Sequence, residues 1–306
     1  MTADFLWQRE LCFFYAFLFM ETPVSVMMDS VMIKNSIRLV VADIDMTLEY
    51  NIQGLPELNR KAIEELHREG ILFALASGRG IAQLMKKASE WKLSFDPDLI
   101  IGVNGQALYD GLLQREDRLL LLEKEWVKEI LDFLDAYGYD YHAYIDTYTL
   151  FRREDSHYYK VFKAVDRDIR LAGSRDDFLK GECFYKFIMM DQDNDMEQLL
   201  RDIQPLLEKH REHFKIVKTT GHTYEIVHAN TSKAYALEIF CERHGIDLQD
   251  VAAFGDADND NEMIEVSGMG VCLKDGQECT KAVAKYITEK DCTEGGFGDF
   301  VFRYIL

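Results

Sequence analysis

Short, continuously apolar segments alternate with amphipathic ones in the first third of this chain. Residues 39–42 read LVVA and residues 71–76 read ILFALA, which is typical of strands buried on both faces. Between them, a segment with helical spacing begins at Pro56 and ends at Gly70. A second helix over about 80–91 precedes a third apolar strand, LIIGVNG. This alternation predicts a doubly wound, mostly parallel α/β sheet.

The middle of the chain, residues 112–226, follows a different pattern. In YDYHAYIDT, polar and apolar positions alternate, as in a strand with one solvated face. Helices intervene, such as EKEWVKEILDFLDAYG. The apolar stripe predicted for that helix consists of Trp126, Ile130, Phe133, Leu134 and Tyr137. A half-solvated antiparallel sheet with helices on one face fits this pattern, so we expect an inserted α+β cap here.

The first pattern returns near the end of the chain. SKAYALEIFCERHG predicts a helix, VAAF a short buried strand, and GDADNDNEMIE a loop that enters another helix. GMGVCL predicts a further strand, and GQECTKAVAKYITE a helix before a last strand. The sequence therefore predicts one core, made of residues 37–111 and 227–306, that is interrupted by one cap.

Residues 1–36 fit neither pattern. They hold an apolar run that is too short to span a bilayer, and the flanking Asp4, Arg9 and Glu10 give no positive n-region. Secretion and a membrane anchor are the alternatives, and neither is the leading interpretation. We expect an N-terminal extension upstream of the fold, with later methionines as alternative starts: Met27, Met28 and Met32.

The composition and net charge limit the classes of molecule that the protein is expected to bind. With 48% hydrophobic and 29% charged residues, the 306-residue chain is typical of a soluble globular protein. The net charge of -19 counts against nucleic acid and anionic membranes, because both are bound through basic surfaces. The negative net charge does not exclude a small anionic substrate, provided that lysine, arginine or a metal ion supplies positive charge at the site. The six scattered cysteines, without a CxxC pair, predict reduced thiols and a cytoplasmic location.

Polar side chains follow each predicted strand of the parallel sheet. These residues are Asp43 and Asp45, Ser77, Asn104, and the loop 256–260. Ligands bind outside the carboxyl ends of strands in open parallel sheets, so we expect these groups to meet in one crevice. Lys233 would join them if its helix packs beside them. Because close carboxylates repel, a divalent cation and this lysine are expected to balance them.

Each of these residues also has an ordinary structural interpretation. Asp43 and Asp45 could form a solvated strand end, and Ser77 could cap the following helix. Lys233 could be a surface lysine. It follows Ser232, a predicted N-cap, so its charge opposes the helix dipole, and nearby carboxylates would explain that placement.

The acidic loop DADNDNE could instead bind calcium in the manner of an EF-hand. Such a loop needs glycine at its sixth position and glutamate at its twelfth. Asn261 and Ser267 stand there, and a strand rather than a helix is predicted before the loop. The calcium interpretation is therefore disfavoured.

Four motifs in order resemble those of the haloacid-dehalogenase superfamily of phosphatases: DIDMTL, SGR, NTSKAYALEIF and GDADND. The insert between the second and third motifs resembles the cap of subclass IIB, the Cof-type hydrolases. The resemblance covers about residues 36–306 and implies a Rossmann-like core with this cap. One such motif is weak evidence, but four in order at predicted strand ends and helix starts are specific.

The resemblance implies a Mg²⁺-dependent phosphatase that acts on small phosphorylated metabolites, foremost sugar phosphates, through an aspartyl-phosphate intermediate. Asp43 would be the nucleophile and Asp45 the general acid and base, while Ser77 and Lys233 would contact the phosphoryl group. The metal site implied consists of Asp43, the backbone carbonyl of Asp45, Asp256 and Asp260. The residues implied to line the substrate site are Thr47, Gly78, Asn104 and Asn259.

One position departs from the family pattern. Met46 stands where the first motif usually has glycine, a residue that permits sharp turns. A catalytically weak phosphometabolite-binding or regulatory protein is therefore an alternative. A phosphomutase on the same scaffold is another, and it would pass the phosphoryl group to a second hydroxyl instead of to water. Substrate identity is expected to reside in the cap, where Lys186, His142 and Tyr144 are candidate contacts or ordinary cap residues.

Overall fold

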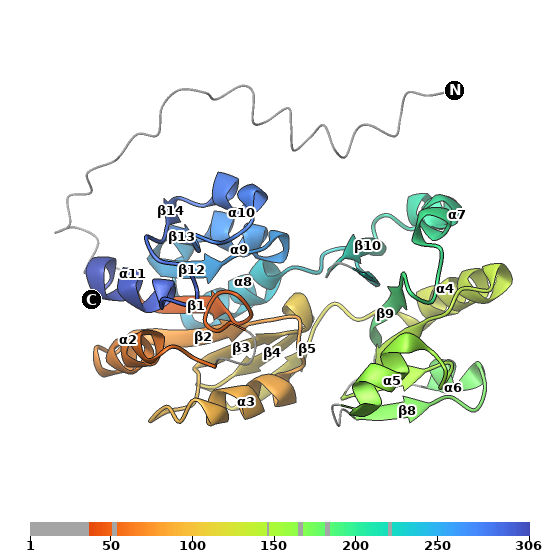
Figure 1. The fold of residues 1–306 in the computed structure, drawn as a ribbon, viewed down its shortest axis with the longest axis horizontal. Coiled ribbons are helices and arrows are strands. Elements are labelled where there is room, and N and C mark those ends of the chain that lie inside the picture. The colour runs from red at the N-terminus through yellow and green to blue at the C-terminus, as the bar shows by residue number, and fades with distance from the viewer. Residues whose placement is uncertain (1–36, 51–53, 146, 165–167, 181–183, 220–221) are drawn as a thin grey trace, which may run out of the picture.

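The computed structural model describes residues 37–50, 54–145, 147–164, 168–180, 184–219 and 222–306. The N-terminal extension expected at residues 1–36 lies outside the described residues. Two sheets organise the chain, one of eight strands and one of six, and they belong to two bodies that lie next to each other (Figure 1). We name the eight-stranded sheet with its helices the core, and the six-stranded sheet with its helices the cap.

The core sheet has the strand order β14-β13-β12-β1-β2-β3-β4-β5. Its strands are β1 (Leu39–Asp43), β2 (Leu72–Ala76), β3 (Leu99–Gly102), β4 (Ala107–Asp110), β5 (Arg115–Arg118), β12 (Val251–Gly255), β13 (Met269–Cys272) and β14 (Tyr286–Ile287). Neighbours from β14 to β3 run parallel, whereas β4 and β5 are added antiparallel. The predicted α/β class with a mainly parallel sheet is confirmed.

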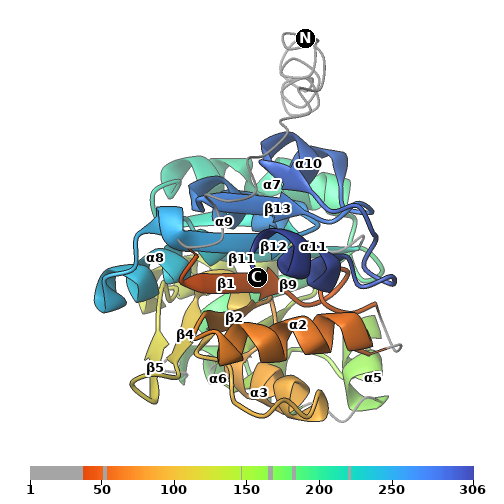
Figure 2. The same ribbon diagram turned by 90° about the vertical axis from the view of Figure 1, so that its left-hand side faces the viewer.

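Helices cover both faces of the core sheet, which explains why its central strands, β1, β2, β3, β12 and β13, are buried along almost their whole length. The helices are α2 (Glu57–Arg68), α3 (Ile81–Glu90), α8 (Lys233–His244), α9 (Asn261–Val266), α10 (Glu278–Val283) and α11 (Gly296–Tyr304). Val40 and Ala42 of β1 pack in one cluster with α2, α3 and α11. Leu39 and Val41 pack in another with α8 and α9. Helices α2 and α11 lie side by side over the first face (Figure 2).

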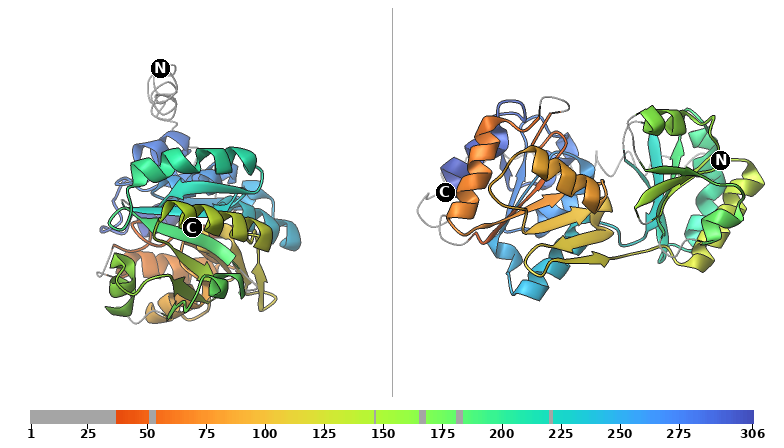
Figure 3. Two further views of the ribbon diagram at one scale, coloured as in Figure 1. Left: turned by 90° about the vertical axis from the view of Figure 1, so that its right-hand side faces the viewer. Right: turned by 90° about the horizontal axis from the view of Figure 1, so that it is seen from below.

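The cap sheet has the order β10-β11-β9-β6-β7-β8 and is antiparallel except between β7 and β8. Its strands are β6 (His142–Ile145), β7 (Tyr148–Phe151), β8 (Ile169–Leu171), β9 (Phe184–Met190), β10 (Phe214–Lys218) and β11 (Thr223–His228). Its helices are α4 (Lys124–Tyr137), α5 (His157–Ala164), α6 (Asp176–Lys180) and α7 (Met196–Lys209). Ala143, Phe187 and Ile226 pack against α4 and α7, which lie on the side of the sheet away from the core (Figure 3).

The boundaries between the two bodies differ from the expected ones. Strand β5 pairs with β4, so residues assigned to the cap from 112 onwards continue the core sheet as a hairpin. At the other end, β11 pairs with β9 and runs to His228, past the expected boundary at 226. Both corrections have the same cause: strand pairing extends beyond the point at which the sequence pattern changes.

Three local expectations also differ from the structure. Tyr137, assigned to the buried stripe of α4, is the last residue of that helix and is 57% exposed. Strand β9 is buried along its whole length instead of half-solvated, because its second face lines the space between cap and core. The predicted helix after 276 ends at Val283, strand β14 follows, and the described chain ends in α11.

No helix in the described ranges is long and apolar enough to cross a membrane.

Candidate active site

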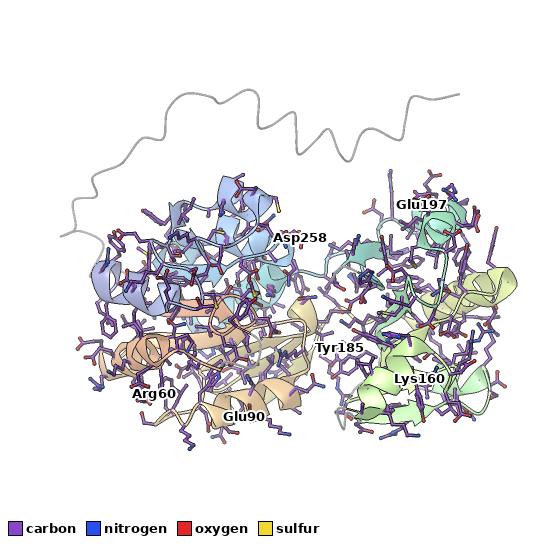
Figure 4. The ribbon with its side chains drawn as sticks, viewed as in Figure 1. Arg60, Glu90, Lys160, Tyr185, Glu197 and Asp258 are labelled. Carbon is purple, nitrogen blue, oxygen red and sulfur yellow. The ribbon has the colours of Figure 1, made fainter. Side chains whose placement is uncertain are left out.

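A cleft of about 1280 Å³ lies at the carboxyl ends of β1, β2 and β12 and is lined by both core and cap. Figure 4 shows Asp258 at the edge of the core that faces the cap, and Tyr185 between the two bodies. The predicted site residues that line the cleft are Asp43, Asp45, Ser77, Gly78, Asn104, Asp256 and Asn259. Three others are fully buried beneath them: Thr47, Lys233 and Asp260. The structure therefore brings the predicted residues together from five separate segments of the chain.

Lys233 lies at the centre of this group. It is the first residue of α8, and the Ser232 side chain caps that helix by accepting from the Tyr235 amide at 3.2 Å. A close approach of two backbones sets this position: at Gly105, a Cβ atom would lie 1.8 Å from the Ser232 carbonyl oxygen. The Lys233 ammonium donates to Asp43 Oδ1 at 2.5 Å and to Asp260 Oδ1 at 2.6 Å.

Asp260 holds both the lysine and the loop that follows β12. Its second oxygen accepts from the backbone amides of Asp256, at 3.0 Å, and Ala257, at 3.2 Å. Glycine is required at 255, because a Cβ there would lie 2.4 Å from that of Asp260. Both oxygens of Asp260 therefore have protein partners, which makes it a residue that positions the loop more than an open metal ligand.

Thr47 has a different place from the one expected. It was predicted to line the substrate site, yet it is fully buried and donates from Oγ1 to Asp256 Oδ1 at 2.9 Å. The hydroxyl thus orients the Asp256 carboxylate, whose other oxygen is left for a different partner. The side chain of Thr47 acts on the site through Asp256.

Three clustered carboxylates, two of them buried and the third, Asp256, half-buried, carry more negative charge than Lys233 balances. Asp43, Asp256 and Asp260 each offer an oxygen, and these atoms lie within 4.8 Å of one another. Burial raises the pKa of Asp43 to about 8 against the pull of Lys233, and that of Asp256 to about 7. Burial would lower the pKa of Lys233, but the carboxylates outweigh it and raise that pKa.

This arrangement fits a hard divalent cation. Mg²⁺ prefers carboxylate, carbonyl and water oxygens, and the cluster offers carboxylates in excess of its single lysine. A cation bound to Asp43 and Asp256 would oppose the rise of both pKa values and keep Asp43 in the charged form. The donor set therefore agrees with the predicted metal site at these two residues.

Asp45 is oriented differently from Asp43. Its side chain is 50% exposed and pairs with Arg79 Nη2 at 2.5 Å, so its carboxylate is outside the buried cluster. Sequence reasoning assigned no role to Arg79, although it directly follows Ser77 and Gly78 in the second motif. The sequence feature that could have identified Arg79 is its positive charge just after the end of a buried strand.

Met46 takes up the backbone conformation for which the family uses glycine. Its φ is 70°, in the left-handed region, and its amide donates to the Glu49 carbonyl at 2.8 Å to close the turn after β1. This conformation costs a side-chain-bearing residue about 1–2 kcal/mol. Met46 also lines the cleft, so the turn is formed and the thioether becomes part of its wall.

The remaining predicted residues form one edge of the cleft. Asn259 Nδ2 donates to Asn104 Oδ1 at 3.3 Å, and Asn104 has a φ of 53°, which asparagine tolerates well. A Cβ at Gly78 would lie 3.3 Å from the Asn104 side chain. Ser77 is 3% exposed, and its hydroxyl accepts from the Arg79 amide at 3.4 Å.

Two of the three cap candidates line the cleft. Lys186 and Tyr144 do, and Tyr144 touches the start of α3, where a Cβ at Gly80 would lie 2.2 Å from the phenol oxygen. His142 is buried behind them and stacks on Phe151 at 4.6 Å between ring centroids. Burial, helped by the charge of Lys186, lowers the pKa of His142 to about 3, so its ring is neutral.

Known proteins resemble this chain in sequence and in fold. Residues 40–301 match the family of haloacid dehalogenase-like hydrolases. The 5-amino-6-(5-phospho-D-ribitylamino)uracil phosphatase YcsE of Bacillus subtilis is 25% identical over 259 residues, which cover 85% of this chain and 92% of that protein. Phosphatase YwpJ of the same organism is 23% identical over 278 residues, covering 82% and 94%.

A solved structure has the same fold. It is a haloacid dehalogenase-like hydrolase from Bacteroides thetaiotaomicron, with a TM-score of 0.75 and 23% identity over 87% of this chain and 99% of that one. The family match spans most of the chain, and the four motifs converge on one cleft. This protein therefore belongs to the haloacid dehalogenase-like hydrolases, as a member of the Cof type.

Proposed function

We propose that this protein is a Mg²⁺-dependent phosphatase that hydrolyses small phosphorylated metabolites, foremost sugar phosphates, through an aspartyl-phosphate intermediate. The observation that carries this proposal is the buried contact of Lys233 with Asp43 beside Asp256, at a strand end that faces a large cleft. The phosphatases among the relatives favour hydrolysis over transfer of the phosphoryl group to a second hydroxyl.

Asp43, Asp256 and the backbone carbonyl of Asp45 would hold Mg²⁺. The bound ion would shield the phosphoryl oxygens from the negative charge of the nucleophile. Asp260 would support this site by fixing Lys233 and the loop that carries Asp256.

In the first step, a carboxylate oxygen of Asp43 attacks phosphorus, and the bond between phosphorus and the leaving alcohol oxygen breaks. Asp45 gives its proton to that oxygen, so the alcohol leaves neutral. Because Asp45 pairs as a carboxylate with Arg79 in this structure, it has to leave that partner and take up a proton from solvent before it protonates the leaving group. In the second step, Asp45 takes a proton from water, the water oxygen attacks phosphorus, and the bond to Asp43 breaks to release phosphate.

Lys233 and Ser77 act by charge and hydrogen bonding. The Lys233 ammonium lies against Asp43 Oδ1, where it offsets negative charge on the nucleophile and on the arriving phosphoryl group. The Ser77 hydroxyl, at the end of β2, offers a donor to a phosphoryl oxygen. Asn104 and Asn259 hold each other at the rim. Each group is positioned by a rigid strand end or helix start.

The deciding experiment is a screen of phosphorylated metabolites for release of inorganic phosphate, with Mg²⁺ and without a bisphosphate activator. We expect turnover of sugar phosphates and of a generic aryl phosphate by the wild type, and none by Asp43→Asn. A fold check by circular dichroism accompanies the variant. Retained turnover in Asp43→Asn would show that the nucleophile is misassigned. Turnover only with a sugar bisphosphate would indicate a mutase, and binding without turnover a regulatory protein.

We also propose a cytoplasmic location, on the basis of the cysteine residues. Cys241, Cys272, Cys279 and Cys292 are free thiols in the described structure. Burial raises the pKa values of Cys241, Cys272 and Cys292 to about 12, so these three thiols are inert at neutral pH. Reduced, unreactive cysteines suit a reducing compartment.

A further inference from the structure

The cap presents one face of its sheet to the catalytic residues. On β9, Lys186 lies opposite Tyr144 of β6 and Val227 of β11, and all three line the cleft. In the next row of the same face, Glu225 of β11 lies opposite Ile188. The intervening residues, such as Phe187 and Ile226, point the other way into the cap interior. The cleft therefore has a wall built from alternate residues of adjacent strands.

A buried ion pair stands in this wall. Lys186 is 8% exposed and Glu225 is 6% exposed, and the lysine ammonium donates to Glu225 Oε1 at 2.7 Å. The second oxygen, Oε2, is buried and has no hydrogen-bond partner among the described residues. A buried carboxylate oxygen without a donor is costly, and native proteins rarely leave one unpaired. In a cleft wall, a donor from a ligand can satisfy it.

The chemistry of the pair selects the group that would bind there. Because Lys186 and Glu225 neutralise each other, the pair does not favour a second phosphate or carboxylate on the ligand. Glu225 Oε2 accepts hydrogen bonds only, and the Lys186 ammonium has further protons to donate beyond the one given to Glu225. A hydroxyl group meets both needs, since it donates to the carboxylate and accepts from the ammonium.

We propose that Lys186 and Glu225 bind a hydroxyl of the leaving group, so that the enzyme prefers phosphate esters of polyhydroxylated alcohols, the sugars and sugar alcohols. This inference rests on the proposed phosphatase function and assigns its leaving-group site to a particular pair. An ester without hydroxyls would leave Glu225 Oε2 unpaired in the complex, and buried polar groups left unpaired are a strong source of discrimination.

The test compares Glu225→Gln with the wild type on sugar phosphates, sugar-alcohol phosphates and p-nitrophenyl phosphate, which bears no hydroxyl. The quantity measured is the ratio of kcat/KM for the hydroxylated ester to that for the aryl ester. We expect this ratio to fall by about 10–100-fold, the range for one charged hydrogen bond in a pocket. An unchanged ratio would overturn the leaving-group site while leaving the phosphatase function standing.

A matched control lies elsewhere in the cap. Glu129 also pairs with a lysine, Lys209, at 2.5 Å, but it lies on α4 and does not line the cleft. Glu129→Gln should leave the ratio unchanged. Glu225→Gln alone leaves Lys186 buried without its counter-charge, which could itself disturb the cleft. The double variant Lys186→Met/Glu225→Gln removes both charges. If both variants lose the same selectivity, the unpaired lysine is not the cause.

A binding measurement separates this inference from the function on which it rests. In the Asp43→Asn background, calorimetry with a sugar phosphate should show weaker binding once Glu225→Gln is added. If the wild type releases no phosphate from any ester, the phosphatase proposal fails, and the calorimetry alone decides the site. Equal affinity with and without Glu225→Gln would then overturn it.

Discussion

The Lys233 ammonium lies 2.5 Å from Asp43 Oδ1, although 190 positions separate the two residues in the chain. The parallel pairing of β1 with β12 and the packing of α8 on the core sheet bring them together. The contact is buried on both sides, since Lys233 is fully inaccessible and Asp43 is 7% exposed. In the proposed mechanism this contact serves catalysis, and it also bears on stability, because removing Lys233 leaves buried carboxylates without their cation.

Replacing Lys233 by methionine should therefore destabilise the protein and abolish turnover. Asp43 and Asp260 would lose the cation that both contact, and breaking a buried ion pair from one side costs about 3–5 kcal/mol. Chemical denaturation at pH 7 measures this loss. Lys281, a half-buried lysine paired with the exposed Glu278 on α10, supplies the control, and Lys281→Met should change stability little. Equal effects of the two substitutions would contradict the role given to Lys233.

Removal of the Asp256 carboxylate should weaken the binding of Mg²⁺. In the wild type, Mg²⁺ should raise the thermal unfolding midpoint, because it binds the folded state only. Asp256→Asn keeps the size of the side chain but loses the charge, so the Mg²⁺ concentration needed for the same shift should rise at least about tenfold. Asp258→Asn, an exposed neighbour in the same loop, should respond like the wild type. Identical titrations of all three proteins would remove Asp256 from the metal site.

The substitution Met46→Gly should stabilise the protein slightly. Glycine removes the cost of about 1–2 kcal/mol that the left-handed backbone imposes on Met46. It also makes the unfolded chain more flexible, which destabilises the folded protein by about 0.5–1 kcal/mol. We expect a net gain below about 1.5 kcal/mol in the free energy of unfolding. The same change at Met85, within helix α3, should cost about 1 kcal/mol. A loss at both positions would show that Met46 is not strained.

The acid sensitivity of the protein should depend on His142. Burial lowers its pKa from 6.5 to about 3 on folding. Below pH 6.5 the unfolded chain therefore binds a proton that the folded protein does not, and stability falls as pH decreases towards 3, by at most about 1.4 kcal/mol per unit. His142→Phe lacks this loss and suits an apolar site beside Phe151. Denaturation at pH 7 and pH 5 measures the difference, and parallel pH profiles would argue against a neutral buried His142.

Much of the candidate site is visible in short segments of sequence. Asp43 ends a strand that is apolar on both faces, and Lys233 follows a serine that caps a helix. Such signals depend on neighbours within a few residues, because strand burial and helix capping are local consequences of side-chain pattern. Most of the core strands and helices were predictable for the same reason.

The partners of these side chains depend on contacts between distant segments. That Asp45 pairs with Arg79, or that Thr47 orients Asp256, follows from how the strand ends meet and not from either segment alone. The membership of β5 in the core sheet is a similar case, since its exposed, charged sequence carries no sign of its partner strand.

Sequence alone thus determined the kind of fold and singled out the groups that we propose carry the chemistry, because local pattern sets strands, helices and their polar ends. Tertiary structure decided which groups are buried together and which buried oxygens have no hydrogen-bond partner within the described protein. The Lys186–Glu225 pair shows why: burial on both faces of β9 arises only when the cap faces the core across the cleft. The charge balance of such a pair follows from the fold as a whole.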